Sequence, residues 1–464
     1  MYRLDSFVKL LSKLTNKYND LSQLKKNVLS GAIFSGLNIL VTLISYPIYL
    51  KYLGVELYGV WVTLSVILTY GLLGEMGMGT AIMRSVAGEY AKKDILNISK
   101  YITTAIYLLL IPTILILGLL MVFNKNIAAF LKIQSVLLDS SSSLILGVGV
   151  LSIFCFYLNL IKGVLAGVGR MDIANYIYLI CRILQIMIAV ILLVSGYGVW
   201  GLYLSHIMFY IFAFSVSVYI LFKHFSIIIF YPFLFNIAKC KELIKFGGVF
   251  MTGSIANMLV IPFNKIIIAR YVGLSEVAYY QIATQVIFAV RGLFVKGLES
   301  IIPKISNVNK TNVGSKQSVL QVHAKCMKLI FFCAIPIFLF LFVFSNQILS
   351  IWLGEEFNIQ ISIILKILAI GWFFNALAVP DHYMFIGIGK VLYSASEKWV
   401  RLVLNFGIIL FFILSNFPLT LTRVTLINCI GLIISAIWLK ILFYMYKFTR
   451  NNMTGKNYVI NSDY

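Results

Sequence analysis

Charged residues are scarce in this 464-residue chain. They make up 12% of it, against about 25% in soluble domains, while hydrophobic residues make up 61%. Apolar runs of 18 or more residues recur along nearly the whole length, and each can cross a hydrocarbon core of about 30 Å as a helix. The runs do not alternate as the strands of a membrane barrel would. The sequence therefore predicts an all-α integral membrane protein.

Several signatures of chemistry are missing as well. The six cysteines show no paired spacing, which argues against a disulfide framework or a zinc site. The four histidines show no metal-ligand spacing, and no G-x-x-x-x-G-K-[ST] motif occurs. We therefore expect no metal, no nucleotide and no other cofactor. The predicted outer loops are short, with the longest at residues 124–143, so they leave little room for a catalytic outer domain and we expect no enzyme.

Twelve apolar runs have the length of membrane helices. They lie at 28–50, 57–80, 101–123, 144–166, 173–195, 199–222, 246–271, 277–300, 328–346, 360–386, 393–415 and 419–446. Of the 38 Lys and Arg residues, 28 fall on the side that holds the N-terminus, five on the opposite side and five inside the runs. A bias of this size places both termini in the cytoplasm. The net charge of +22 thus reports topology, and we expect no nucleic-acid partner.

The first 27 residues predict a basic amphipathic segment. Leu4, Phe7, Leu11 and Leu14 follow helical spacing, and lysines lie on another face. Such a helix can lie on the anionic cytoplasmic leaflet, or it can be a basic topogenic tail or a short coiled-coil seam. The pattern leaves these alternatives open.

A weak internal repeat divides the chain. Residues 51–54 (KYLG) match 270–273 (RYVG) at an offset of 219, and 167–170 (GVGR) match 387–390 (GIGK) at 220. Six runs per half is an even number, so the two halves are expected to be parallel repeats. We predict six-helix lobes at 28–232 and 233–448, followed by a cytoplasmic tail at 449–464. Two such lobes would face a central cleft, as alternating access requires.

Charges inside the runs are the candidate binding groups, because each costs about 2.5 to 3.5 kcal/mol at mid-membrane unless it meets water or a partner. The residues concerned are Arg182, Lys265, Arg291, Lys366 and Arg401. The matching segments 51–54 and 270–273 each form a repeated corner between two runs. Arg291 and Lys265 lie in the two runs that flank the second corner, and they favour a cationic cleft for an anionic substrate. The alternative is snorkelling for Lys265 and Lys366, and an interhelical structural bond for Arg182. The repeat aligns Arg182 with Arg401, which could pair with Glu397.

Acids inside the runs are few. Glu75 and Arg84 lie near the end of the second run, where an ion pair is favoured over an ion-coupling site. Arg84 is also a candidate substrate contact at the cytoplasmic mouth. Lys51 and Arg270 occupy the repeated corner and are candidates for a gate or an ion pair.

The first quarter of the chain also carries a recognisable signature. LKYLGVELYGVWVTLSVI followed by GEMGMGTAIMRSVAGEYAKKD resembles the first-lobe signature of polysaccharide transporters, the O-antigen (Wzx-type) flippases and their capsule relatives within the multidrug/oligosaccharidyl-lipid/polysaccharide flippase superfamily. Many members of the family carry Asp where this chain has Glu75, so the role of that acid is not carried over. The resemblance extends to length, twelve spans, basic loops and two lobes.

The resemblance implies transfer of an undecaprenyl-diphosphate-linked oligosaccharide across the bacterial cytoplasmic (inner) membrane. Arg291, Lys265, Arg84 and Arg182 are then the expected substrate contacts. Membrane lipids and other glycan-assembly membrane proteins are the expected partners. The alternatives are a multidrug or cation antiporter of the same superfamily, which should carry a deep carboxylate in one lobe, and a membrane glycan polymerase or ligase, which should carry a long outer loop.

Overall fold

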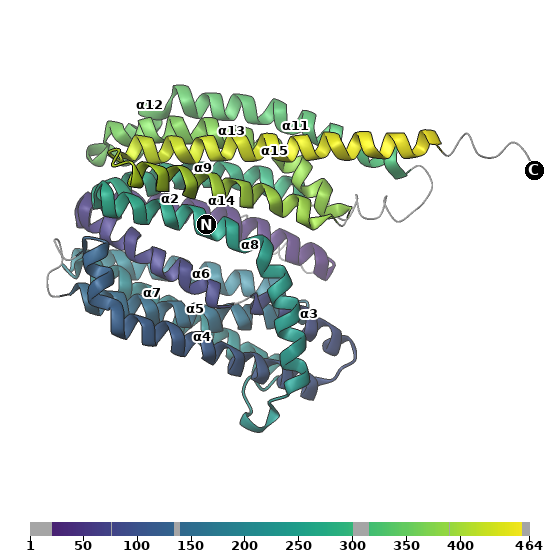
Figure 1. Cartoon of the computed structure of the whole chain (residues 1–464). Helices are drawn as coiled ribbons and strands as arrows, with labels where there is room; N and C mark the ends of the chain where they lie inside the picture. Colours follow the sequence, from purple (N-terminus) through teal and green to yellow (C-terminus); the bar gives the residue numbers. More distant parts are fainter. Residues whose placement is uncertain (1–20, 76, 134–139, 300–314, 389, 457–464) are drawn as a thin grey trace, which may run out of the picture. The chain divides into compact units, whose positions relative to one another are not determined.

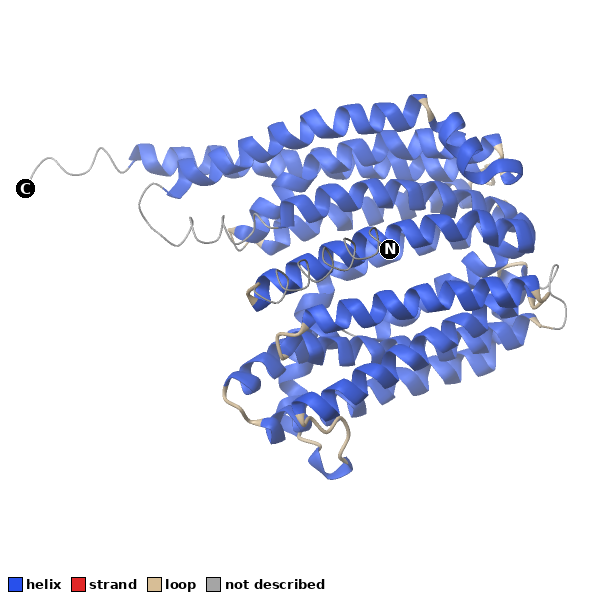
Figure 2. Cartoon of the chain, turned by 180° about the vertical axis from the view of Figure 1, so that it is seen from behind, coloured by secondary structure: helices blue, strands red, loops and turns tan. Residues whose placement is uncertain are grey.

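The computed structural model describes residues 21–75, 77–133, 140–299, 315–388 and 390–456. Within these ranges the chain forms helices and no strands, as Figure 2 shows. The all-α prediction is therefore confirmed for the described part of the chain. Most of the predicted amphipathic segment at 1–27 lies outside the described residues.

Thirteen α-helices and three short 3-10 helices make up the described chain (Figure 1). The α-helices are α2 (Gln23–Gly71), α3 (Met78–Ala91), α4 (Ile95–Phe130), α5 (Ser141–Gly167), α6 (Met171–Val194), α7 (Gly198–Phe225), α8 (Ile237–Tyr271), α9 (Leu274–Glu299), α11 (Ser315–Val343), α12 (Ser345–Leu353), α13 (Ile359–Gly387), α14 (Val391–Leu414) and α15 (Leu421–Lys456). The 3-10 helices are η1 (Leu72–Glu75), η3 (Pro232–Leu234) and η4 (Gly354–Glu356).

Eight of the described helical stretches are long and apolar enough to cross a membrane. One of them runs through α2, which contains the first predicted span and most of the second. The two parts meet at Gly54, whose φ of 71° and ψ of 169° interrupt the helix. A left-handed φ is easy only for glycine, which explains why the corner requires this residue. The protein is thus a multi-pass membrane protein, and the count of twelve spans stays a prediction.

The helix boundaries repeat at the offset seen in the sequence. Helix α6 runs from residue 171 to 194 and α14 from 391 to 414, so both bounds differ by 220. Helix α5 ends at Gly167 and α13 at Gly387, again 220 apart. The matched glycine motifs therefore end equivalent helices and start equivalent ones.

The chain folds into two compact units. Unit 1 holds the chain up to Ser45 together with Gly71–Asn124 and Ser142–Phe250. Unit 2 holds Tyr46–Tyr70, Lys125–Ser141 and the chain from Met251 onward. Helices α2, α4 and α8 thus contribute to both units. Each predicted lobe, at 28–232 and 233–448, is one continuous segment, whereas each unit combines several segments of the chain. The division into two lobes stays a prediction.

In unit 1, hydrogen bonds and a cation–π contact connect the start of α8 to α4. The Tyr101 hydroxyl donates to Glu242 Oε2 at 2.6 Å, and Lys239 Nζ lies 3.7 Å from the centre of the Tyr101 ring. The Asn236 backbone N–H donates to the Thr104 hydroxyl at 3.2 Å. Burial lowers the pKa of Lys239, and the nearby carboxylates of Glu89 and Glu242 only partly oppose this. These contacts explain why 237–250 belongs to unit 1.

In unit 2, α13 is the central helix. It packs against α9, α11, α14 and α15, and Figure 1 shows α11, α13 and α15 running side by side. In an 18-residue apolar stretch of α13, 61% of the residues are buried, compared with 22% in the corresponding stretch of α11. Because α13 is enclosed on most sides, its polar side chains have protein neighbours rather than lipid.

Helices α2 and α9 pack against each other close to the two repeated corners within unit 2. A Cβ atom at Gly59 of α2 would lie 1.9 Å from the carbonyl oxygen of Leu274, the first residue of α9. Nearby, Gln281 of α9 donates to the hydroxyl of Tyr46 on α2 at 2.9 Å. The contact therefore depends on a residue without a side chain at position 59.

We expect Gly59→Ala to destabilise the protein, because a backbone atom cannot move aside as a flexible side chain can. Overpacking of this kind costs about 1 to 3 kcal/mol. The melting temperature of the purified, detergent-solubilised protein should fall. Gly407→Ala in α14 is the matched control, since a Cβ there would meet nothing within 4 Å. An equal or higher melting temperature for Gly59→Ala would contradict the packing described for this corner.

Candidate functional site

Two arginines flank one tryptophan in unit 2. The guanidinium carbons of Arg291, on α9, and Arg401, on α14, each lie 5.0 Å from the centre of the Trp372 ring on α13. Trp372 is 3% exposed and Arg401 is 4% exposed. A desolvated cation–π contact is worth about 2 kcal/mol, which offsets part of the cost of placing each charge in the membrane.

A single amide connects Arg291 to a buried carboxylate. Arg291 Nε donates to Asn375 Oδ1 at 3.4 Å, and Asn375 Nδ2 donates to Glu397 Oε1 at 3.1 Å. The Ser435 hydroxyl of α15 also donates to Glu397 Oε1, at 3.5 Å. Glu397 is 7% exposed, so these neutral donors replace the water that a carboxylate needs.

The expected ion pair between Arg401 and Glu397 is not formed among the described residues. Arg401 Nη2 donates instead to Asn428 Oδ1 at 3.0 Å, and Asn428 Nδ2 donates to the Tyr280 hydroxyl at 3.1 Å. Asn264 on α8 donates to the same hydroxyl at 3.2 Å. One polar chain therefore joins α8, α9, α14 and α15 and fixes the position of Arg401, whereas the spacing of four residues along α14 does not by itself bring the two charges together.

These groups line a cavity. Its larger part has a volume of about 90 Å³, and its polar lining consists of Arg291, Asn375, His382, Tyr383, Glu397 and Lys398. A smaller part of about 20 Å³ shares four of these residues and adds Trp372 and Arg401. On this measure of volume one water molecule needs about 10 to 15 Å³, so the larger part has room for a group of several heavy atoms. Among the described residues, Arg291 and Lys398 line both parts together with Glu397, and Arg401 lines the smaller part.

Two buried donors in the smaller part lack an acceptor among the described residues. They are Trp372 Nε1 and Arg401 Nε. Buried N–H groups are nearly always hydrogen-bonded in folded proteins, and each unsatisfied one costs about 1 to 3 kcal/mol. The cavity therefore has positive charge in its lining, and two N–H groups without a described acceptor lie in residues that line it.

A second buried charge cluster lies in α11, α13 and α15. The Asp381 carboxylate is fully buried, and it lies 2.7 Å from His323 Nε2 and 3.1 Å from Lys440 Nζ. The His323 ring stacks on Phe443 with centroids 4.2 Å apart. The residues around Asp381 in the chain carry no sign of these partners, because the partners come from helices distant in sequence.

We expect Asp381→Ala to lower the melting temperature of the purified protein strongly. Removing one member of a buried ion pair costs about 3 to 5 kcal/mol, because the remaining charge loses its partner. Asp381→Asn combined with Lys440→Met removes both charges and should recover part of the loss. A double variant no more stable than Asp381→Ala would contradict a structural role for this pair.

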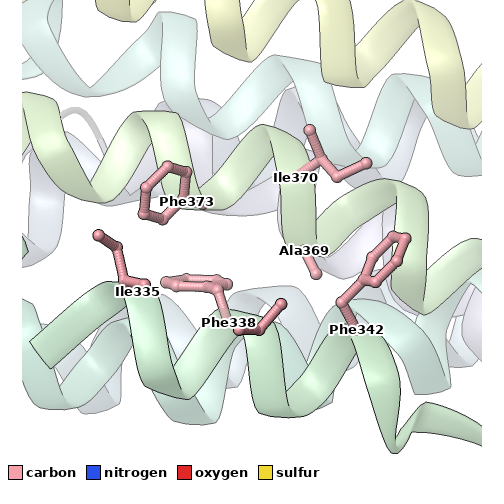
Figure 3. Close-up of a pocket in the computed structure, with 7 residues that line it drawn as sticks. Ile335, Phe338, Phe342, Ala369, Ile370 and Phe373 are labelled. Carbon is pink, nitrogen blue, oxygen red and sulfur yellow. The ribbon is translucent and has the colours of Figure 1, made fainter.

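An apolar pocket of about 310 Å³ lies on another side of α13. Ile335, Phe338 and Phe342 of α11 face Ala369, Ile370 and Phe373 of α13 across it, as Figure 3 shows. Its lining is formed by hydrocarbon side chains of membrane-type helices. Helix α13 thus has a polar cavity on one side and an apolar pocket on another.

The remaining candidates of unit 2 lie outside the cavity lining. Lys265 on α8 and Lys366 on α13 are half-buried. Lys51 is exposed beside the Tyr52 ring, at 6.0 Å, and the Arg270 guanidinium lies 5.3 Å from the Phe130 ring. Of the candidates assigned to unit 2, the structure brings together Arg291 and Arg401.

The candidates of unit 1 have separate surroundings. Arg84 on α3 is exposed, and its guanidinium lies 4.5 Å from the Phe246 ring. Arg182 on α6 donates to Gln185 Oε1, and Gln185 Nε2 lies 3.3 Å from His206 Nδ1 on α7. Arg182 therefore bonds to a residue of its own helix, and it is Gln185 that extends the polar contact to α7.

The favoured ion pair between Glu75 and Arg84 is not formed in the described structure. Glu75 Oε1 accepts from the Gly79 backbone N–H at 3.0 Å, and Oε2 accepts from Asn159 Nδ2 at 3.1 Å. Gly77 has a φ of 68° and separates the 3-10 turn that holds Glu75 from α3. The carboxylate therefore binds the first turn of α3 and Asn159 of α5.

Several cavity residues do not stand out in the sequence. The charge pattern places Lys398 among the basic residues at the cytoplasmic ends of the spans, yet it lies in α14 and lines the cavity. Trp372 and Asn375 are indistinguishable from other residues of an apolar run. Their spacing of three places them on the same face of α13, which is the one signal that could have selected them.

Comparison with solved structures identifies the class of fold. The structure of the lipid II flippase MurJ in an inward closed conformation matches 89% of this chain and 87% of its own, with a TM-score of 0.69 and 15% identity. An inward-facing multidrug-resistance MATE transporter of the MOP superfamily matches 90% and 95%, with a TM-score of 0.64 and 15% identity. The fold is therefore the one shared by these flippase and multidrug-transporter structures.

The family follows from the sequence itself. The model of the polysaccharide biosynthesis protein family matches residues 51–362, and the chain belongs to this family. A Shigella flexneri protein named "Putative O-antigen transporter" is 27% identical over 179 residues. That match spans 37% of this chain and 40% of the relative. The family resemblance carried by the signature residues is thus confirmed.

Proposed function

We propose that this protein is a flippase that moves an undecaprenyl-diphosphate-linked oligosaccharide, an O-antigen or capsule repeat unit, across the bacterial cytoplasmic membrane. The observation that carries the proposal is the cationic cavity of unit 2. Arg291 and Lys398 line it beside the carboxylate of Glu397, and Arg401 lines its smaller part, all inside helices of membrane length. A diphosphate cannot enter hydrocarbon unaided, and guanidinium and ammonium groups are the natural substitutes for its water.

The size of the cavity supports a binding mode in which only one part of the substrate enters it. The larger part fits a phosphoryl group and is too small for an oligosaccharide, so the glycan would extend from the cavity and the polyprenyl chain would stay in lipid. Two predicted lobes that open alternately to either side would then carry the headgroup across. Both termini would lie in the cytoplasm, and other glycan-assembly membrane proteins would supply and receive the substrate. Lys265, Arg84 and Arg182 remain proposed additional contacts.

The electrostatics of the cavity disfavours the alternative of a drug or cation antiporter. Among the described lining residues, an organic cation would face Arg291, Lys398 and Arg401, and the Glu397 carboxylate there already accepts two hydrogen bonds. An anionic headgroup finds the opposite balance of charge. The family of the chain points the same way, since it is named for polysaccharide biosynthesis.

We expect Arg291→Gln to abolish surface glycan in a cell that depends on this protein for its export. The amide can still bond to Asn375, but the charge that would bind a phosphate is gone. Glycan at the cell surface and protein in the membrane should be measured together, because the loss must occur at an unchanged protein level.

Lys366→Gln is the matched control. It removes a positive charge from the adjacent helix α13, at a residue that lines neither part of the cavity, and it should leave surface glycan unchanged. Normal surface glycan with Arg291→Gln would contradict the assignment of this cavity to the substrate.

A further inference from the structure

The connection between α7 and α8 has an unexpected surface for a segment outside the predicted spans. It lies between the sixth apolar run, 199–222, and the seventh, 246–271, in a stretch expected to be a cytoplasmic loop. From residue 228 to the first residue of α8, six large apolar side chains are exposed, and Phe233 is 88% exposed. They are Ile228, Phe230, Tyr231, Phe233, Phe235 and Ile237. Contiguous exposed apolar surface of this kind indicates an interaction site.

This segment turns back along the side of α4. Helix α7 is followed by Ser226, whose left-handed φ of 54° turns the chain. The Tyr231 backbone N–H then donates to the Thr103 hydroxyl at 3.2 Å, and that of Asn236 donates to the Thr104 hydroxyl at 3.2 Å. Figure 1 shows the connection, directly before α8, beside α4. The segment is therefore held by contacts to α4.

The length of α4 sets the level of the segment in the membrane. Its 36 residues extend roughly 54 Å, so about 12 Å project beyond a hydrocarbon core of about 30 Å at each end of a centred helix. Thr103 lies roughly 12 Å and Tyr107 roughly 18 Å from the first residue, Ile95. The Tyr107 ring contacts those of Phe230 and Phe235, with centroids 5.7 and 5.5 Å apart. These contacts place the segment at the boundary between headgroups and hydrocarbon.

The apolar surface of the segment continues that of α4. Leu110, Ile111 and Ile114 follow Tyr107 at helical spacings of three, four and seven residues, so they lie on the same face of the helix. All three are exposed, and Ile114 is 68% exposed. Helix α4 is long and apolar enough to cross a membrane, so an exposed apolar face on it is a face for lipid. The aromatic side chains of the segment extend this face toward the headgroups.

The backbone of the segment is suited to a place with little water. The Leu234 N–H donates to the Tyr231 carbonyl at 2.9 Å, and Pro232 has no N–H that needs a partner. Asn236 Oδ1 accepts from the N–H groups of Ala238 and Lys239 at 3.0 and 3.1 Å and caps the start of α8. Irregular backbone beside lipid needs such partners, because hydrocarbon offers none.

Basic residues border the segment on both sides along the chain. Lys223 precedes it, Lys241 and Lys245 follow it, and all three are exposed. Aromatic rings together with lysines are typical of membrane interfaces, where the rings lie at headgroup level and the ammonium groups attract anionic lipids. This combination of charge and level favours a lipid leaflet over an apolar protein partner.

We propose that residues 228–237 form an aromatic anchor, which inserts into the headgroup boundary of the membrane leaflet at this end of α4. Phe233 reaches the first carbons of the acyl chains, and the bordering lysines contact lipid phosphates. The aromatic anchor holds the connection between α7 and α8 at a fixed level in the membrane. It does not depend on which substrate the protein carries.

The photoreactive residue p-benzoylphenylalanine reports what covers the anchor. It replaces Phe233, Ile114 near the middle of α4, or Lys92 after α3, whose side chain is 69% exposed. Each full-length protein is reconstituted into vesicles of phosphatidylethanolamine and phosphatidylglycerol and irradiated, and the adducts are identified by mass spectrometry. Position 114 is the control for contact with acyl chains, and position 92 is the control for contact with water.

We expect position 233 to form roughly tenfold more lipid adduct than position 92, because interfacial aromatic residues lie against lipid. Its yield should approach that of position 114. A fluorescent amino acid at the same positions, combined with brominated lipids, measures the depth. Bromine near the ester groups should quench position 233 most strongly, and bromine deep in the acyl chains should quench position 114 most strongly.

A second variant tests whether the side chain at 233 holds the segment in the leaflet. The photoreactive residue is placed at Ile237, which is 69% exposed, and Phe233 is changed to Asp or to Leu. Phe233→Asp should lower the lipid adduct at position 237 roughly fivefold, because a carboxylate is costly in hydrocarbon and draws the segment toward water. Phe233→Leu keeps an apolar side chain and should retain the adduct.

Three results would overturn the anchor. One is a lipid yield at position 233 no higher than at position 92. Another is a crosslink from position 233 to the same chain or to a second copy, since protein would then cover this surface. The third is an equal yield at position 237 in Phe233→Asp and Phe233→Leu.

Discussion

The cost of placing charge in a membrane is the constraint on which the structure of unit 2 depends. Each charged side chain at mid-membrane costs about 2.5 to 3.5 kcal/mol unless the protein replaces its water. Unit 2 replaces that water in two ways. Trp372 offers its ring to two guanidinium groups, while Asn375 and Asn428 supply hydrogen bonds to charged partners. Helix α13 carries the first two of these side chains, and its central position among the helices of the unit brings them into contact with residues of α9 and α14.

The two buried charge clusters of unit 2, around Asp381 and around Glu397, accommodate their carboxylates in opposite ways. Around Asp381, a histidine and a lysine bond the carboxylate directly, and the charges are satisfied internally. Around Glu397, the carboxylate bonds to neutral donors, and the Nε of Arg401 keeps unfilled hydrogen-bonding capacity among the described residues. The first arrangement stabilises the packing of three helices. The second leaves positive charge in the lining of a cavity, which is what a site for an anion needs.

Much of the fold could be predicted from the sequence, because hydrophobic length and the glycine motifs are local signals. The apolar runs predicted helices, and the glycine motifs at 167–170 and 387–390 marked the ends of α5 and α13. Gly54 marked the corner in α2. What could not be predicted is which side chains meet. Arg401 and Glu397 are four residues apart, yet Arg401 bonds to Asn428 on another helix, and Glu75 bonds to Asn159 rather than to Arg84.

The internal repeat shows why the contacts between side chains could not be predicted from the sequence. Helices α6 and α14 have boundaries that differ by 220 residues, whereas Arg182 and Arg401 differ by 219. One residue turns a side chain by about 100° around a helix, so the two arginines leave equivalent helices in different directions. Arg182 accordingly bonds to Gln185 on its own helix, and Arg401 bonds to Asn428 on α15. Helices α6 and α14 thus have equivalent bounds but surround their arginines with different polar residues. Glycines fix the ends of these helices, whereas the partners of each arginine depend on the few polar residues beside it.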